Sequence, residues 1–163
     1  MDTRKIAISA VVGAAYAVLT IFLAPISYGA VQFRVSEALT VLPFYFPSTV
    51  WGLFIGCLIA NIFSPAVTIF DIVFGSLATL LAGYLTSKVK SKWLAPLPPV
   101  IVNAVIIGLV LAYASAPGAM LAAFPAIALS VGAGEFGACY LLGMPLLFVL
   151  PKVRMLGLNE PGK

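Results

Sequence analysis

Two long stretches of this chain carry no charged residue, and they limit the possible folds more than any other feature. They run from residue 38 to residue 70 and from residue 93 to residue 134. A span of about 20 apolar residues is enough to cross the hydrocarbon core of a bilayer. The sequence therefore predicts a polytopic membrane protein.

The overall composition supports this prediction. Hydrophobic residues make up 63% of the chain and charged residues only 9%, with a mean hydropathy of +1.15. A soluble domain carries about 25% charged residues, so an ordinary cytoplasmic domain and a disordered chain are both excluded. Backbone groups cannot stay unpaired in lipid, which leaves helices or a closed barrel. Because the apolar runs are continuous rather than alternating, we predict an all-α integral membrane protein, with residues 1–163 as one transmembrane domain.

Proline, glycine and polar residues divide the apolar sequence into six predicted helices. The predicted helices cover about residues 6–24, 37–46, 49–63, 71–87, 97–115 and 125–150. A loop is expected over 25–36 and a turn at 116–118. Because Pro43 and Pro47 interrupt the apolar run over 37–63, a re-entrant hairpin there is an alternative that leaves four true spans.

The basic residues predict the orientation in the membrane. Lys and Arg cluster at 4–5, 88–92 and 152–154. Cytoplasmic loops carry an excess of these residues, and six crossings place all three clusters and both termini on the cytoplasmic side. Trp51 and Trp93 then fall at the inner membrane face, where tryptophan is enriched.

Several chemistries lack the residues that they need. The chain has no histidine, and Cys57 and Cys139 stand alone in apolar runs, so no metal or cofactor site is expected. The sequence has no phosphate-binding GxxxxGK[ST] loop. The excess of basic residues is small, clustered and explained by topology, so nucleic acid is not an expected partner.

Four charged residues remain inside or near the predicted spans: Arg34, Glu37, Asp71 and Glu135. A charge at the bilayer centre costs about 2.5–3.5 kcal/mol on insertion scales, which makes such residues candidates for function. Arg34, Glu37 and Asp71 gather near the outer side with Asn61, whereas Glu135 lies deeper. Arg34 and Glu37 could instead pair with each other at their i,i+3 spacing, and Asp71 could be a helix cap.

Glu135 is the strongest candidate for a binding residue. Glycine and alanine flank it on both sides, and no cap role is available in the middle of a span. Such a carboxylate needs a ligand, a cation or a proton, or else an internal pair with Arg34. Asn103 and Tyr140 are weaker candidates, because they are expected to bond another helix and to pack in the core, respectively. The predicted pocket suits a small planar or cationic solute with several N–H donors, and aromatic rings are within reach at Tyr28, Phe33, Phe63, Phe70 and Phe74.

Small residues recur at four-residue spacing in three helices. They form the stripes Ala10–Ala14, Gly52–Gly56–Ala60 and Gly75–Thr79–Gly83. Such stripes let helix backbones approach closely. Packing within the chain accounts for most of them, but the first stripe could instead bind a partner subunit.

Several segments resemble a known family over about residues 3–155. The specific ones are VQFRVSEALT from residue 31 and NIFSP from residue 61 with the following Asp71, supported by TRKIAISAVVGAAYAVLT from residue 3 and PPVIVNAVIIGL from residue 98. They resemble the substrate-binding S components of energy-coupling factor (ECF) transporters, which are vitamin importers of the bacterial plasma membrane. Within this group the chain is most similar to the QueT type, assigned to queuosine-precursor uptake.

This resemblance implies a function without catalysis. S components have six helices, cytoplasmic termini and an outward-facing pocket, here for a 7-deazaguanine such as preQ0 or preQ1. By similarity, Ala10 and Ala14 would dock on a membrane coupling subunit that two ATPase subunits drive. The alternatives are an S component for another vitamin-like solute, a small intramembrane enzyme using Glu135 and Asp71, and a purely structural subunit.

Overall fold

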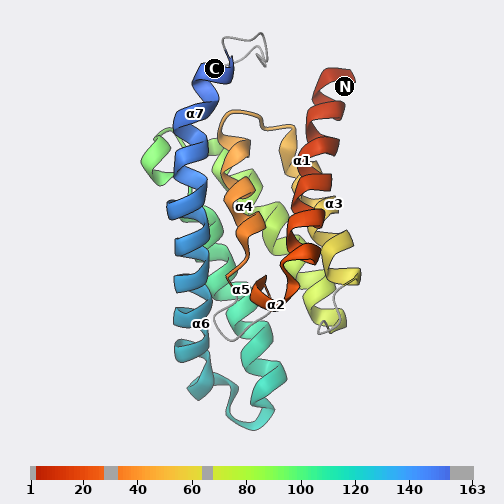
Figure 1. The fold of residues 1–163 in the computed structure, drawn as a ribbon. Helices are drawn as coiled ribbons and strands as arrows, with labels where there is room; N and C mark the ends of the chain where they lie inside the picture. The colour runs from red at the N-terminus through yellow and green to blue at the C-terminus, as the bar shows by residue number, and fades with distance from the viewer. Residues whose placement is uncertain (1–2, 28–32, 64–67, 155–163) are drawn as a thin grey trace.

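The described residues form helices joined by short connections, which confirms the all-helical prediction. The computed structural model describes residues 3–27, 33–63 and 68–154, with side chains as far as Leu150. In chain order the elements are α1 (Thr3–Phe22), α2 (Ala24–Ser27), η1 (Val35–Phe44), α3 (Thr49–Ile62), η2 (Asp71–Gly75), α4 (Ser76–Lys88), η3 (Lys92–Leu94), α5 (Leu97–Ser115), η4 (Pro117–Ala119), α6 (Met120–Phe136), η5 (Gly137–Gly143) and α7 (Met144–Arg154). The long helices lie side by side, and α1 begins at the same end of the bundle at which α7 ends (Figure 1).

Three helical stretches of the described chain are long and apolar enough to cross a bilayer. They are Thr3–Phe22, Lys92–Ser115 and Pro117–Leu150, while Val35–Phe44 and Thr49–Ile62 are shorter apolar helices. Large apolar side chains cover the outside of the bundle, and carboxyl and amide side chains are buried inside it. An outer surface this rich in large apolar side chains fits a bundle surrounded by lipid.

The helix boundaries differ from the prediction mainly in the last span. That helix begins at Met120 rather than at residue 125, passes Pro125 and continues beyond Pro151. Prolines are tolerated inside membrane helices because neighbouring helices compensate for the lost backbone bond. In the predicted loop over 25–36, Ala24–Ser27 is helical, and residues 28–32 lie outside the described residues. The range Leu97–Ser115 coincides with the prediction.

The predicted helix over 37–46 is a 3₁₀ helix, η1, over Val35–Phe44. A 3₁₀ helix rises about 2.0 Å per residue, against about 1.5 Å in an α-helix. Ten residues therefore extend about 20 Å instead of about 15 Å, which lets a short segment reach far through the bundle. The helix is buried along most of its length and packs against α1, α3, α4, η5 and α7. It is the central element of the fold.

Glycine brings α1 and α3 into backbone contact. A Cβ atom at Gly52 would overlap the carbonyl of Ser9, and one at Gly13 would overlap the carbonyl of Gly52. A Cβ atom at Gly56 would in turn overlap the carbonyl of Gly13. We call these three glycines the α1–α3 seam. The Gly52–Gly56 stripe therefore packs within the chain, one of the two roles predicted for such stripes.

Candidate functional site

Two glutamates from separate helices meet in the interior of the bundle. Glu37 is 1% exposed and Glu135 is 5% exposed. Residues of α1, η1, α5, α6 and η5 surround them. We call this group the carboxyl cluster; it comprises Tyr16, Arg34, Glu37, Asn103, Glu135 and Cys139.

Glu37 has one bonded and one available oxygen. The Tyr16 hydroxyl donates a hydrogen bond to its Oε1. Its Oε2 is buried and receives no hydrogen bond from any residue that the structure describes. The backbone is anchored separately, because Thr40 Oγ1 donates to the Glu37 carbonyl over 2.6 Å. A buried acceptor left open in this way is costly unless a donor fills it, so Oε2 is a natural contact for a ligand.

Glu135 is held from the opposite side of the cluster. Asn103 Nδ2 donates to its Oε1 over 2.9 Å, which joins α5 to α6. Cys139 Sγ lies 3.8 Å from Glu135 Oε2 and 3.5 Å from the Glu37 carbonyl oxygen. The thiol therefore lies between the two glutamates. Asn103 bonds another helix, as predicted, and the residue that it bonds is the candidate carboxylate itself.

The 3₁₀ geometry of η1 aligns its polar side chains. Residues three apart eclipse one another in such a helix. Arg34, at its N-cap, therefore continues the row formed by Glu37 and Thr40. Arg34 is buried, and its positive charge acts on both Glu37 and Glu135. The cluster thus combines two carboxyl groups with one guanidinium.

Glycines in η5 allow η1 and the nearby Phe33 to approach η5 closely. A Cβ atom at Gly143 would lie 2.9 Å from a methyl group of Val41. A Cβ atom at Gly137 would lie 2.8 Å from the ring of Phe33, so this aromatic ring packs beside the cluster. The η5 segment is a π-helix, a distortion that often occurs at functional sites. The absence of a side chain at Gly137, two residues after Glu135, is what leaves room for this ring.

Asn61 and Asp71 lie together but form a different arrangement. Asn61 Nδ2 donates to the Asp71 carbonyl oxygen over 3.1 Å. The Asp71 carboxylate accepts hydrogen bonds from the backbone N–H and the hydroxyl of Thr68, over 3.0 and 2.8 Å. The Asp71 N–H lies 3.4 Å from Thr68 Oγ1. This reciprocal pattern is a capping box in which Thr68 is the N-cap and Asp71 the residue three positions later, so Asp71 caps the helix start but not from the N-cap position that was predicted for it. Asn61 also lies 3.5 Å from Cys57, which packs against Tyr16.

Tyr140 and most of the predicted aromatic residues face elsewhere. The Tyr140 hydroxyl donates to the Trp93 carbonyl over 3.2 Å, and its ring stacks on Phe136 at 4.5 Å. Phe70 and Phe74 stack on each other and line a groove of about 460 Å³ on the outer surface. Phe63 is 69% exposed, and Tyr28 lies outside the described residues.

Sequence reasoning missed Tyr16 and assigned Cys139 no role at the site. The available signal was a polar stripe on α1. Ser9, Tyr16 and Thr20 follow one another at spacings of seven and four, which places them on one helix face. All three are buried, and Thr20 Oγ1 donates to Ser36 Oγ over 2.6 Å. An apolar membrane helix carrying such a stripe turns that stripe toward a polar interior.

Ala10 and Ala14 lie on the outer side of α1, next to the seam. Both are exposed. Together with residues of α3, including Ile55 and Ile59, they line a shallow groove of about 360 Å³. Gly13 also lines this groove, but it is buried against the backbone of α3. The small residues of α1 thus divide into an internal set and a surface set.

Taken together, the apolar helices and the carboxyl cluster define a small helical membrane protein with ionisable groups in its interior. Comparison with known families identifies it further. Residues 6–152 match the family model for the QueT transporter, and the chain belongs to this family. This confirms the resemblance to the QueT type seen in the sequence, and that family is one of transporters rather than enzymes.

A curated relative supports the same family. The queuosine precursor transporter QueT of Lactococcus lactis subsp. cremoris (strain MG1363) is 41% identical over 81 residues. That alignment covers 48% of this chain and 47% of the relative, so the matched part is about half of each protein. No solved structure matches the chain significantly.

Proposed function

We propose that the chain is the substrate-binding S component of an ECF-type importer and that it binds a queuosine precursor at the carboxyl cluster. The observation that carries this proposal is the buried pair Glu37 and Glu135, because Glu37 Oε2 receives no hydrogen bond from the described residues. The family assignment and the name of the Lactococcus relative supply the class of substrate.

The chemistry of a 7-deazaguanine suits this cluster. A guanine-like edge offers an N1–H and an exocyclic amino group side by side, and one carboxylate can accept both hydrogen bonds. Glu37 or Glu135 can act as this acceptor. Phe33 packs beside the cluster at Gly137 and offers a ring on which the base can stack, which contributes about 1–3 kcal/mol.

The charge of the cluster favours a cationic precursor. A cation bound in the cluster would favour the ionised form of both carboxyl groups, and together with the Arg34 guanidinium these would sum to one negative charge. Buried charge is costly unless it is compensated, and a ligand ammonium group would bring the site to neutrality. The aminomethyl compound preQ1 carries such an ammonium, whereas the nitrile preQ0 does not. We therefore expect preQ1 to bind about tenfold or more tightly than preQ0.

We extend the proposal to topology and partners. Six passes through the membrane with cytoplasmic termini agree with the basic clusters, and the proposed location is the bacterial plasma membrane, where the protein would be a multi-pass subunit. The groove at Ala10 and Ala14 is the proposed docking surface for the coupling subunit, with two ATPase subunits supplying the energy. Small residues at this surface allow a partner helix to approach closely.

Calorimetric titration of the purified full chain with preQ1, preQ0, guanine and a panel of B vitamins tests the binding proposal. We expect saturable binding of a deazaguanine. Glu37→Gln and Glu135→Gln should each weaken it by about 30-fold or more, because a charged acceptor is lost. Asp71→Asn is the matched control, since the same change in the capping box should leave affinity intact.

Three results would contradict the proposal in different ways. Binding of a vitamin in place of a deazaguanine would keep the S-component role and replace the substrate. Full affinity in both glutamate variants would move the site away from the carboxyl cluster. If the folded protein bound none of these solutes, the substrate-binding role itself would be wrong.

A further inference from the structure

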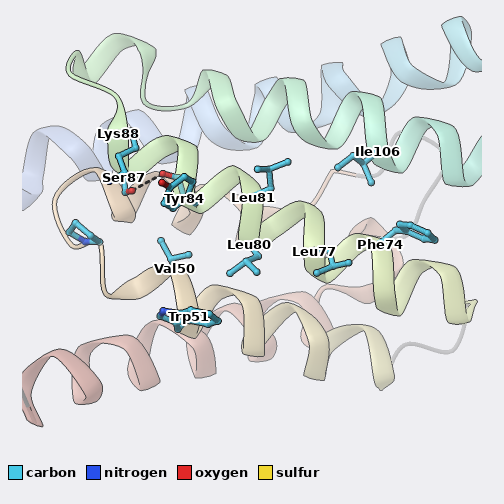
Figure 2. Close-up of a pocket in the computed structure, with 11 residues that line it drawn as sticks. Val50, Trp51, Phe74, Leu77, Leu80, Leu81, Tyr84, Ser87, Lys88 and Ile106 are labelled. Atoms are coloured by element: carbon cyan, nitrogen blue, oxygen red, sulfur yellow. Dashed lines mark hydrogen bonds between the residues drawn. The ribbon is translucent and has the colours of Figure 1, made fainter. Parts of the chain in front are cut away.

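Two apolar grooves on the outside of the bundle meet at a single lysine. The larger groove, of about 810 Å³, lies between α3 and α4, and a second one of about 350 Å³ lies between α4 and α5. Lys88 lines both. Figure 2 shows the larger groove, with lining side chains that follow α4 and the preceding η2 from Ser87 and Lys88 at one end to Phe74 at the other.

The end of the grooves at Lys88 is positively charged. Lys88 ends α4, and its Nζ lies 5.3 Å from the centre of the Tyr84 ring. Lys90 and Lys92 follow in the sequence, which has no acidic residue between Asp71 and Glu135. A lysine with an apolar stem beside aromatic rings is typical of the interface between lipid tails and headgroups.

We propose that an anionic phospholipid with two acyl chains binds here, with its phosphate at Lys88 and one chain in each groove. The site goes beyond the proposed transport function and depends only on the chain lying in a membrane. From Phe74 to Lys88 the larger groove follows 14 helical residues, or about 21 Å. This is more than half of a hydrocarbon core about 30 Å thick, so the groove is long enough to hold an extended acyl chain.

The shape of the site favours a lipid over a protein partner. An α-helix with its side chains is about 10–12 Å wide and would cover one continuous face. Here two separate grooves diverge on either side of α4 and converge on one cation. One anionic group with two apolar tails matches this arrangement of charge and surface. Anionic headgroups are attracted to clustered basic residues near the membrane surface.

Tryptophan fluorescence can test this proposal directly. The chain has two tryptophans, so Trp93→Phe leaves Trp51, on the wall of the larger groove, as the single reporter. The variant is reconstituted in phosphatidylcholine vesicles that contain brominated-acyl phosphatidylglycerol or, at the same mole fraction, brominated-acyl phosphatidylcholine. We expect the brominated phosphatidylglycerol to quench Trp51 more strongly than the brominated phosphatidylcholine, by an amount that corresponds to about fivefold enrichment of phosphatidylglycerol at the site.

Two charge variants, made in the Trp93→Phe background, distinguish a specific lipid site at Lys88 from a general attraction of anionic lipids to the basic loop. Lys88→Gln should abolish the excess quenching. Lys90→Gln is the matched control, because Lys90 is exposed in the same basic loop but does not line the larger groove. Its excess quenching should persist.

Several results would overturn the proposal. Equal quenching by the two lipids would show that the groove does not select an anionic headgroup. Equal losses in Lys88→Gln and Lys90→Gln would assign the preference to the whole basic loop. If neither lipid quenched Trp51, the groove would be closed to lipid and covered by a protein or a second copy of the chain. Substrate titration of the same samples reports separately on the proposed transport function.

Discussion

The α1–α3 seam and the carboxyl cluster use the same helix in opposite ways. At the seam, Gly13 has no side chain, so two regular helices touch through their backbones. At the cluster, Tyr16 lies about one turn further along the same buried face of α1 and donates to Glu37 on a 3₁₀ helix. The seam contributes packing between regular helices, whereas the cluster presents polar atoms on irregular ones. The comparison teaches that the regular part of the bundle holds the irregular part in position.

The seam should be the more sensitive of the two regions to added volume. In Gly52→Ala the new methyl group would overlap the Ser9 carbonyl, which is backbone and cannot move aside. We expect a loss of about 3 kcal/mol or more in the free energy of unfolding, measured by denaturation in detergent. Gly118→Ala is the matched control, because nothing lies within 4 Å of its Cβ position. Equal stability of the two variants would disprove the backbone contact.

The outer face of α1 should separate uptake from binding. Ala14→Leu would place a larger side chain in the groove that we propose as the docking surface for the coupling subunit. We therefore expect uptake into cells to fall by about tenfold or more. Substrate affinity of the purified chain should stay within about twofold, because the groove lies outside the carboxyl cluster. Ala126→Leu makes the same change at an exposed position of α6 and should preserve both. Parallel loss of uptake and affinity in Ala14→Leu would refute a separate docking surface.

The cluster should respond to the loss of a single hydrogen bond. Tyr16→Phe keeps the ring in the core but frees Glu37 Oε1, so the carboxylate is no longer held in one orientation. We expect substrate affinity to fall by about tenfold while the fold is retained. Tyr113→Phe, at an exposed position on α5, is the control. Unchanged affinity in Tyr16→Phe would show that the tyrosine has no part in positioning the carboxylate.

The capping box at Asp71 should show the smallest effect. Asp71→Ala removes the acceptor for Thr68, which should cost about 1 kcal/mol of stability and leave substrate affinity unchanged. Thr68→Ala should cost a similar amount, and the double variant should cost less than the sum. A large loss of affinity in Asp71→Ala would instead place this carboxylate in the binding site.

Most of the helices could be predicted because apolar length and proline positions act locally. The range 97–115 is an example, since Leu97–Ser115 is one uninterrupted helix. The last helix was predicted less well, because the helix continues through Pro125 and Pro151 within the bundle. For the candidate site, the free-energy cost of a charge within the membrane singled out Glu37 and Glu135. It could not predict that the two side chains lie in the same cluster.

The amino-acid sequence by itself determined the class of protein and the residues that need compensation. Apolar length requires membrane helices, and a charge within them requires a partner whatever the details of the fold. Only the tertiary structure decided which partners these are. In the tertiary structure Val35–Phe44 is a 3₁₀ helix, Asn103 donates a hydrogen bond to Glu135, and Asp71 accepts one from Thr68. The physical reason is that helix type and register are set by packing between distant segments, which no local pattern encodes.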